Sequence, residues 1–319
     1  MPRDFFRKAS PGSTLVNGTI ISDIQLALNA WGANLPADLI YGTQTAAAVS
    51  SFQSSHKVPV TGNISEATWN LLMRTDGPPI FERCLQVVAS FEGTGFSLVV
   101  GNFDGAGITW GIVGFTLIGG ELGQVLRQIN QSYPDLIGKA FGSDAAEIMD
   151  ITDPNTTNSE KTAWASSISR GSKNYNVADP WRTYFHDLGS YREVQRIQVA
   201  RARDTYWTIA SKDVATLELG DELDHLLLFD VAVQNGGMGR KGRVKLIQEK
   251  LARDHPKTAR DKRLVIANVV ADTVSGYQAD VLARKTTIAT GRGTVHDGQY
   301  DLGDWGLLDG QMPSPPLTS

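Results

Sequence analysis

The stretch Gly101-Asn-Phe-Asp-Gly-Ala-Gly-Ile-Thr-Trp-Gly-Ile-Val-Gly-Phe-Thr116 differs from the rest of the chain. Its glycines alternate with β-branched and aromatic residues, which predicts short, tightly turned strands and not a helix. Two of its polar residues could carry chemistry. Asp104 lies on a turn that the glycines open, where a carboxylate stays ionised and can take a proton from water. Thr109 begins a predicted strand, where its hydroxyl could hold that water against Asp104.

A second carboxyl group, that of Glu92, follows an apolar stripe. The stripe consists of Phe81, Leu85 and Val88 at helical spacing, and the same spacing continues to Glu92. Gly93 is then expected to end the helix. Partial burial favours the protonated form of a carboxyl group. One protonated and one ionised carboxyl group with a held water can hydrolyse a glycosidic bond. The alternative for Glu92 is a surface position at a helix end.

The helix predicted over Glu222 to Gln234 offers further candidates. Asp230 and Gln234 lie one turn apart on its leucine-rich face, and Asn235 follows. We expect these three to face a substrate, or Asp230 to form a buried ion pair with an arginine. Trp110, Tyr175 and Trp181 could stack on sugar rings or pack in the core.

The remaining sequence predicts a mainly α protein. A cluster of Pro and Gly at residues 75–79 separates a small N-terminal module from the rest. We expect domains at 1–76 and 80–311, with a loose tail at 312–319. A Ser/Thr/Asn-rich stretch, 142–181, is expected to be irregular with short helical pieces. The predicted helices are Leu15–Trp31, Thr43–Ser54, Ser65–Met73, Phe81–Phe91, Glu121–Ile129, Ser190–Ser211, Glu222–Gln234, Arg243–Arg253 and Arg260–Arg284.

Composition excludes several classes of protein. With 319 residues the chain has room for about two domains. The single cysteine argues against a disulfide framework. The five histidines lack metal-binding spacing, which argues against a zinc enzyme, and no histidine is placed to activate the cysteine of a cysteine peptidase. We therefore expect no metal or cofactor. No apolar run approaches the roughly 18 residues of a membrane span, and no cleavable signal is visible.

Charge is unevenly distributed. Residues 79–233 carry 12 basic and 20 acidic side chains, whereas residues 234–292 carry 13 basic and 5 acidic ones. Such a dipolar chain is not typical of a nucleic-acid-binding protein, and the basic segment is either a set of solvated helix faces or a contact for an anionic polymer.

The N-terminal module resembles the peptidoglycan-binding domain of bacterial and phage lytic enzymes. The resemblance rests on Tyr41-Gly42, Thr45, Ala48-Val49, Phe52-Gln53, Val58-Pro59-Val60, Gly62 and Thr68-Trp69-Asn-Leu-Leu72. It implies a three-helix fold that binds the bacterial wall, with Tyr41, Phe52 and Trp69 among the contacts.

The stretch Asp104 to Thr116 resembles the DGxGxTxGxxGF signature of glycoside hydrolase family 46 chitosanases, in the lysozyme superfamily. The resemblance implies a lysozyme-like α+β domain, with helical lobes and a small β-hairpin region. It also implies inverting catalysis, with Glu92 as acid, Asp104 as base and Thr109 positioning water. The separation of 12 residues between the two carboxyl groups is short for the family.

Together the two resemblances predict an endolysin-type enzyme that cleaves the β-1,4 glycan backbone of peptidoglycan. We expect a monomer made in a host cytoplasm and released to the wall, without nucleic acid or membrane insertion. The alternatives are a chitosanase, which the acidic segment would suit, a lytic transglycosylase, or a non-catalytic wall-binding virion protein.

Overall fold

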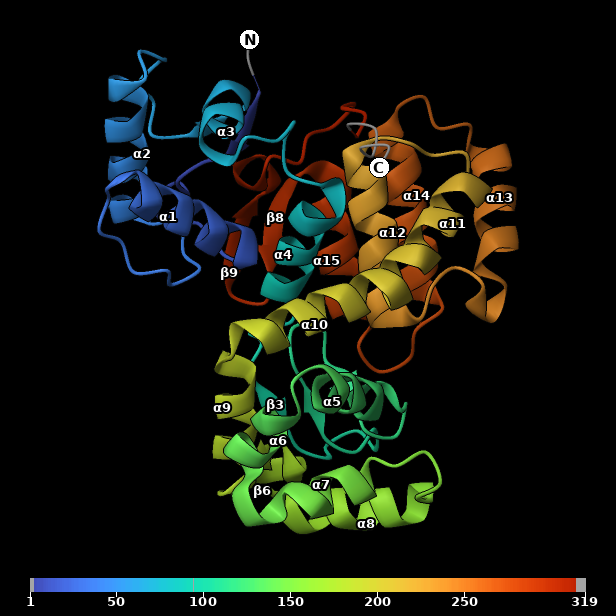
Figure 1. The fold of residues 1–319 in the computed structure, drawn as a ribbon. Helices are drawn as coiled ribbons and strands as arrows, with labels where there is room; N and C mark the ends of the chain where they lie inside the picture. Colours follow the sequence, from blue (N-terminus) through green and yellow to red (C-terminus); the bar gives the residue numbers. More distant parts are fainter. Residues whose placement is uncertain (1–2, 94, 314–319) are drawn as a thin grey trace. The chain divides into compact units, whose positions relative to one another are not determined.

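The computed structural model describes residues 3–93 and 95–313, and the chain divides into two compact units (Figure 1). The first unit combines residues up to 91 with those from 206 onward. The second unit comprises residues 92–205. The predicted boundaries at 76 and 80 remain a prediction, and of the predicted tail, residues 314–319 lie outside the described part of the chain.

The N-terminal module is a three-helix unit, as predicted. Its helices are α1 (Thr19–Trp31), α2 (Thr43–Ser55) and α3 (Glu66–Met73). The first begins four residues later than predicted because Gly18, at φ 138°, is not helical. Two short strands were not predicted: β1 (Asp4–Phe6) pairs antiparallel with β2 (Ile64–Ser65).

The remainder of the first unit is a helical bundle with one hairpin. Arg260–Arg284 was predicted as one helix, but the chain breaks at residues 273–277, where Thr273 ends one helix and Gly276 takes φ +93°. The elements are α4 (Ile80–Phe91), α11 (Thr208–Thr216), α12 (Glu222–Asn235), η4 (Arg240–Gly242), α13 (Arg243–Asp254), α14 (Ala259–Asp272), α15 (Gln278–Thr290), the antiparallel pair β8 (Arg292–Val295) and β9 (Gly298–Asp301), and η5 (Leu302–Trp305).

Glu222, at the start of α12, joins three distant segments of the first unit. Its fully buried carboxylate accepts hydrogen bonds from Arg3 next to β1 at 2.6 Å and from Arg83 of α4 at 2.7 Å. The backbone N–H of Leu308 donates to the same carboxylate at 3.2 Å. Both arginines also donate to the carbonyl oxygen of Gly306. A buried charge needs such partners to remain ionised, so these contacts hold the N-terminal strand against the helical bundle.

The second unit contains the glycine-rich stretch and a group of helices. The stretch forms short strands, as predicted: β3 (Val99–Val100), β4 (Thr109–Trp110) and β5 (Phe115–Thr116) make a three-stranded antiparallel sheet. The other elements are α5 (Glu121–Ser132), α6 (Pro134–Phe141), η1 (Gly142–Asp144), α7 (Ala145–Ile151), α8 (Asn158–Ile168), β6 (Ser169–Arg170), η2 (Ser172–Asn174), β7 (Asn176–Val177), α9 (Trp181–Ser190), α10 (Arg192–Ala202) and the π-helical η3 (Arg203–Trp207), which runs into the first unit.

Two predictions for the second unit need correction. The stretch 142–181 is largely helical, because Thr157 and Glu160 form a capping box that starts α8. The helix predicted over Ser190–Ser211 begins two residues later, at Arg192, because Tyr191 adopts an extended conformation after α9. From Arg192 the chain stays helical through α10, η3 and α11 to Thr216.

The protein is therefore mainly α with small β-hairpins, as the sequence predicted. Cys84 of α4 is buried, and this burial raises the pKa of its thiol. Within the described ranges, none of the helices is both long and apolar enough to cross a bilayer.

Candidate active site

Glu92 is the first residue after α4, and its side chain is half-buried. Almost every residue of α4 is buried, so the helix has little freedom to move its end. Gly93 takes φ +63° and lets the chain turn away, as predicted from its position. The carboxyl group thus stands at the point where a rigid helix gives way to a loop.

The loop between β3 and β4, which carries Asp104, is fixed at its base by Asn102. The side-chain Oδ1 of Asn102 accepts a hydrogen bond from the N–H of Gly107 at 3.1 Å. Its Nδ2 donates to Oγ of Ser166 at 3.0 Å, and its backbone N–H donates to Oγ of Ser169 at 2.9 Å. These bonds connect the loop to α8 and β6, so it is anchored despite its glycines.

Asp104 lies on the exposed part of this loop, as predicted. Its Oδ1 accepts a hydrogen bond from the N–H of Ala106 at 3.0 Å, which closes a local turn and orients the carboxylate. Gly105 between them takes φ +84°. Within residues 3–93 and 95–313, Oδ2 of Asp104 makes no hydrogen bond, so this oxygen can accept a proton from solvent.

Thr109 starts β4, as predicted, and is half-buried. It pairs with Val100 of β3 and with Thr116 of β5, so it occupies the middle strand of the sheet. Asp104 lies on the loop that joins Val100 to Thr109. The structure therefore places Asp104 and Thr109 on one hairpin, and Glu92 on the segment that leads into it.

The tight packing of this hairpin depends on Gly111. It takes φ +87°, and a Cβ atom at this position would lie 2.4 Å from Oε1 of Gln198 on α10. The same oxygen accepts a hydrogen bond from the N–H of Ile112 at 3.0 Å. A larger residue would be strained at this φ and would displace the side chain of Gln198, whose hydrogen bonds tie the hairpin to α10.

An exposed aromatic pair lies beside Asp104. Phe103 is 46% exposed and Tyr175 is 52% exposed, and their ring centroids are 5.3 Å apart. The N–H of Gly101 donates to the carbonyl oxygen of Tyr175 at 2.8 Å, which holds the two segments together. Sequence reasoning did not select Phe103 as a site residue, although it directly precedes Asp104. Exposed, paired aromatic rings are suited to contact the apolar face of a sugar.

Trp110 has a packing role, which corrects the prediction of a sugar contact. Its side chain is fully buried, and its indole N–H donates to the carbonyl oxygen of Phe185 at 3.1 Å. Trp110 follows Thr109 on a strand, and successive side chains of a strand point to opposite faces. The indole is therefore on the core side of the sheet and out of reach of a ligand.

Asp230 also lies in the core, which corrects its assignment to a substrate and favours the alternative of a buried ion pair. Its carboxylate is fully buried between Arg284 and Lys285 of α15, with Oδ2 2.6 Å from Nζ of the lysine. Burial acts to raise the pKa of Asp230, but the two cations outweigh it and hold this pKa below its usual value.

Gln234 and Asn235 adjoin this ion cluster. The side chain of Gln234 accepts a hydrogen bond from Lys285 and donates one to Asp280 at 2.8 Å. The carbonyl oxygen of Asn235 accepts from Arg243 at 2.9 Å, which helps to end α12. Both residues are half-buried. The contacts of Gln234 connect helices, so the prediction that it binds a substrate gains no support from its surroundings.

The aromatic residues implied as wall contacts form the core of the N-terminal module instead. Tyr41 is fully buried and donates to the carbonyl oxygen of Gly62 at 2.8 Å. Phe52 and Trp69 are also buried. By contrast, Trp31 at the end of α1 is 41% exposed and packs edge-on against Phe52. Trp31 therefore lies at the surface of the module, whereas the three predicted residues lie inside it.

Two cavities lie away from Asp104, one in the N-terminal module and one in the second unit. In the module, a cavity of about 220 Å³ is bordered by Gln25, Asp38 and Thr45, whose side chains hydrogen-bond to one another. In the second unit, a cavity of about 600 Å³ lies against α7 and α8. Its lining combines the indole of Trp164 with three carboxylates, those of Glu147, Asp150 and Glu160.

A metal site of three or more His, Cys, Asp or Glu side chains does not occur in the part of the chain that the structure describes.

Comparison with known protein families identifies the N-terminal module. Residues 17–72 match a family model described as "Putative peptidoglycan binding domain". The match spans α1, α2 and most of α3, and it includes all the residues, from Tyr41 to Leu72, on which the resemblance rests.

Comparison with solved structures finds chitosanases. A native chitosanase from Bacillus subtilis MY002 has 16% identity and a TM-score of 0.48, covering 68% of this chain and 95% of that one. A family GH46 chitosanase of Gynuella sunshinyii in complex with chitotetraose has 18% identity and a TM-score of 0.43, covering 65% of this chain and 84% of that one. The sequence matches no curated protein.

Proposed function

We propose that this protein is a glycoside hydrolase that cleaves the β-1,4 glycan backbone of bacterial peptidoglycan. The observation that carries the proposal is the anchored loop, which presents Asp104 beside the exposed rings of Phe103 and Tyr175. The peptidoglycan-binding match of residues 17–72 supports the choice of polymer. The DGxGxTxGxxGF resemblance supports the choice of chemistry.

In the proposed reaction, Glu92 donates its proton to the glycosidic oxygen as the bond from that oxygen to the anomeric carbon breaks. A water held by Thr109 attacks the anomeric carbon from the opposite face and gives its proton to Asp104. The product has the inverted configuration. This mechanism requires the two carboxyl groups to lie roughly 6.5–9.5 Å apart, with room for the water between them.

The aromatic pair would hold the sugar over Asp104. A sugar ring has an apolar face, and an exposed aromatic ring can stack on that face while the hydroxyl groups stay in water. Binding of the polymer by the N-terminal module would raise the local concentration of the wall around the site. We also propose that the enzyme is a monomer of the endolysin type. It would be made in a host cytoplasm and would reach the wall after its release.

Digestion of purified sacculi tests the proposal, with mass spectrometry of the released fragments. Hydrolysis yields fragments with reducing ends, and the Glu92→Gln variant should yield almost none. Anhydro ends would indicate a lytic transglycosylase instead, which requires only the acid. Tight binding to sacculi without released fragments would indicate a non-catalytic wall-binding protein.

A chitosanase is the second candidate function, and one specific observation favours it. The cavity against α7 and α8 joins Trp164 to three carboxylates, within a segment that carries 20 acidic and 12 basic residues. Carboxylates and an aromatic face suit a cationic amino sugar. Purified chitosan and peptidoglycan should therefore be offered in parallel. Faster cleavage of chitosan would favour this candidate over the first.

A further inference from the structure

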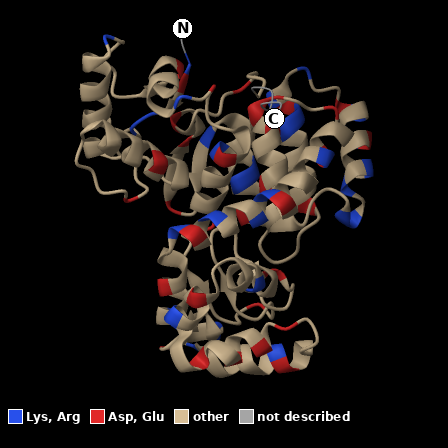
Figure 2. Ribbon diagram, viewed as in Figure 1, with Lys and Arg blue, Asp and Glu red and all other residues tan. Residues whose placement is uncertain are grey.

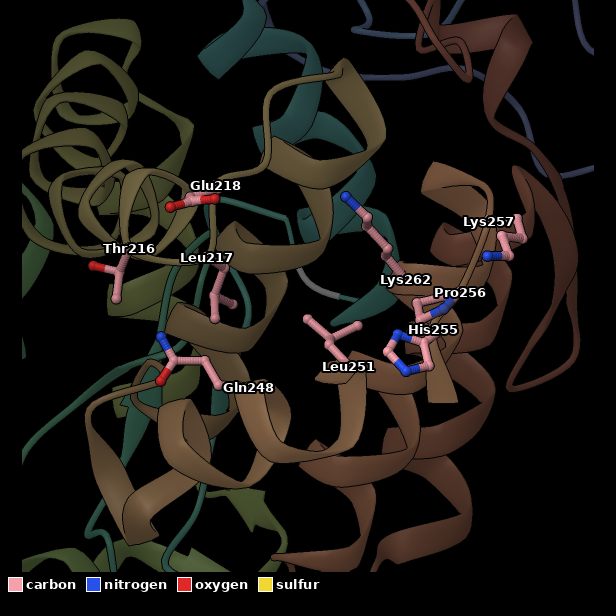
Figure 3. A pocket seen from close by; sticks show the side chains of 9 residues that line it. All are labelled: Thr216, Leu217, Glu218, Gln248, Leu251, His255, Pro256, Lys257 and Lys262. Carbon is pink, nitrogen blue, oxygen red and sulfur yellow. The ribbon is translucent and has the colours of Figure 1, made fainter. Parts of the chain in front are cut away.

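A separate pocket lies within the first unit, where α11, α13 and α14 meet (Figure 3). We call it the α11–α13 pocket. Its volume is about 460 Å³, within the range of about 300–1,000 Å³ that is common for ligand sites. Its lining comes from the end of α11, the second half of α13, the loop after α13 and the second turn of α14. The residues are Thr216, Leu217, Glu218, Gln248, Leu251, His255, Pro256, Lys257 and Lys262.

The pocket has two walls of opposite character. In Figure 3, Glu218 stands on one side with Thr216 and Gln248, while Lys257 and Lys262 stand on the other. Two leucines, Leu217 and Leu251, lie between the walls and form an apolar floor. A ligand that fills the pocket would thus meet a negative charge at one end and positive charges at the other.

These charges are available to a ligand. Within the described ranges, Glu218, Lys257 and Lys262 form no ion pair, whereas neighbouring Asp254 is paired with Lys250 and Arg253. Other charges of the basic segment, 234–292, are engaged (Figure 2). Arg263, Arg284 and Lys285 neutralise buried carboxylates, and Arg243 donates to the carbonyl oxygens at the end of α12. The lysines of the pocket remain free to bind.

Two helices end at this pocket in a left-handed residue other than glycine, as α3 also does at Arg74. Glu218 follows α11 at φ 51°, and His255 follows α13 at φ 44°. Helices commonly end with one left-handed residue, and this residue is usually glycine, because other residues are strained there. Both positions instead hold ionisable side chains that line the pocket. Strain of this kind is more frequent at functional sites than elsewhere.

We infer that the α11–α13 pocket binds a short peptide that carries both a free carboxylate and a free amine, namely the stem peptide of peptidoglycan. The lysines would receive the carboxylate, Glu218 would receive the amine, and the leucine floor would contact the aliphatic side chains between them. A phosphodiester polymer such as teichoic acid fits less well, because Glu218 would repel it. The choice of peptide rests on the proposed function.

A titration of the full chain with a synthetic stem tetrapeptide, N-acetyl-L-Ala-γ-D-Glu-L-Lys-D-Ala, whose lysine carries its single free amine, tests the inference. Binding is measured by calorimetry. We expect Glu218→Gln and Lys262→Gln each to weaken binding about fivefold, the effect of removing one exposed charge contact. The matched control is Lys245→Gln, an exposed lysine of α13 outside the pocket, which should bind as the wild type does. Equal affinities for all four proteins would overturn the inference.

Blocked peptides test the orientation. With the lysine amine of the peptide acetylated, Glu218→Gln should have no further effect, whereas Lys262→Gln should still weaken binding. Poly(glycerol phosphate) is titrated in parallel. If Glu218→Gln strengthens its binding and the tetrapeptide does not bind, the pocket is a phosphate site and the peptide inference is wrong.

Glu218→Gly separates a binding role from a structural one. Glycine relieves the left-handed backbone, so we expect the Tm to hold or rise while peptide affinity falls. A lower Tm together with lost binding would show that Glu218 serves only the fold.

Two measurements on the wild type distinguish this inference from the proposed function. Cleavage of peptide-free glycan strands without tetrapeptide binding would overturn the inference alone. Tetrapeptide binding without cleavage of any glycan would overturn the proposed function alone.

Discussion

Asp104 of the β3–β4 loop and Asp230 of α12 have the same chemistry in opposite settings. Asp104 is exposed on a loop, and one of its oxygens is held only by the N–H of Ala106. Asp230 is fully buried and is held by Arg284 and Lys285. The first carboxylate is oriented but still open to solvent, whereas the second is neutralised by its partners. Orientation without neutralisation is what a catalytic base requires, and neutralisation in the core is what a structural anion requires.

This contrast predicts that substitutions in the two regions will change different quantities. The loss of a loop carboxylate should change the rate of reaction and leave stability intact. The loss of a core carboxylate should change stability first. Four experiments, in order of decreasing expected effect, test this division.

The largest effect is expected for the two proposed catalytic carboxyl groups. Glu92→Gln and Asp104→Asn should each lower the rate of glycan hydrolysis by about 10²–10⁴-fold, the usual contribution of a general acid or base. The free energy of unfolding should change little. Rates are measured by release of reducing ends from sacculi, and unfolding by urea titration. Full activity of a folded Glu92→Gln variant would contradict its role as the acid.

In α12, Asp230→Asn should destabilise the protein by about 3–5 kcal/mol, because Arg284 and Lys285 then remain buried without their carboxylate. Urea unfolding measures the change. The matched control is Asp204→Asn, which removes an exposed pairing with Arg203 and should cost less than about 1 kcal/mol. Similar costs for both variants would show that burial does not distinguish them.

The pH dependence of stability should follow from the same ion cluster. The pKa of Asp230 is lowered in the folded protein, so the folded state holds its proton less readily than the unfolded state does. The resulting stabilisation is present above about pH 4, the pKa of an unperturbed aspartate, and is lost as the pH falls through the folded-state value. The Tm should therefore fall less steeply between pH 7 and pH 2 for Asp230→Asn than for the wild type.

The smallest effect is expected at Thr109. Thr109→Val removes one hydrogen bond to the attacking water and should lower the hydrolysis rate about tenfold. Its cross-strand neighbour Thr116 is the control, since its hydroxyl bonds to Glu121 and not to the proposed water. Thr116→Val should affect stability more than rate. Equal rate losses in both variants would indicate that the hairpin has been distorted.

The sequence predicted correctly those elements that depend on the spacing of apolar residues and on turn residues close by in the chain. The helix that leads to Glu92 and the glycine-rich hairpin follow from spacing and turn residues, and both occur where expected. The prediction of a single helix across Thr273 was wrong, because the spacing of apolar residues does not show where this helix ends. Its apolar pattern continues through the break, and only the placement of Gly276 marks the turn.

The site required information that a local pattern does not contain. Asp230 has its partners 54 and 55 residues away, so the sequence left both a substrate role and an ion pair open. Phe103 becomes a candidate only because Tyr175 packs against it from a distant turn. The aromatic residues of the binding module matched a family pattern, but that pattern records their packing and not their exposure.

The position of Glu222 has a consequence for the order in which the chain can fold during synthesis. The guanidinium of Arg3 donates hydrogen bonds to Glu222 and to the carbonyl oxygen of Gly306, while the backbone of Phe5 packs closely against Gly306. N-terminal domains generally fold first on the ribosome. Here β1 can pair with β2 early, but the side chain of Arg3 must wait for Glu222 and Gly306. A truncated translation product would therefore leave Arg3 unpaired and Phe5 without part of its cover, and would be a substrate for chaperones or proteases.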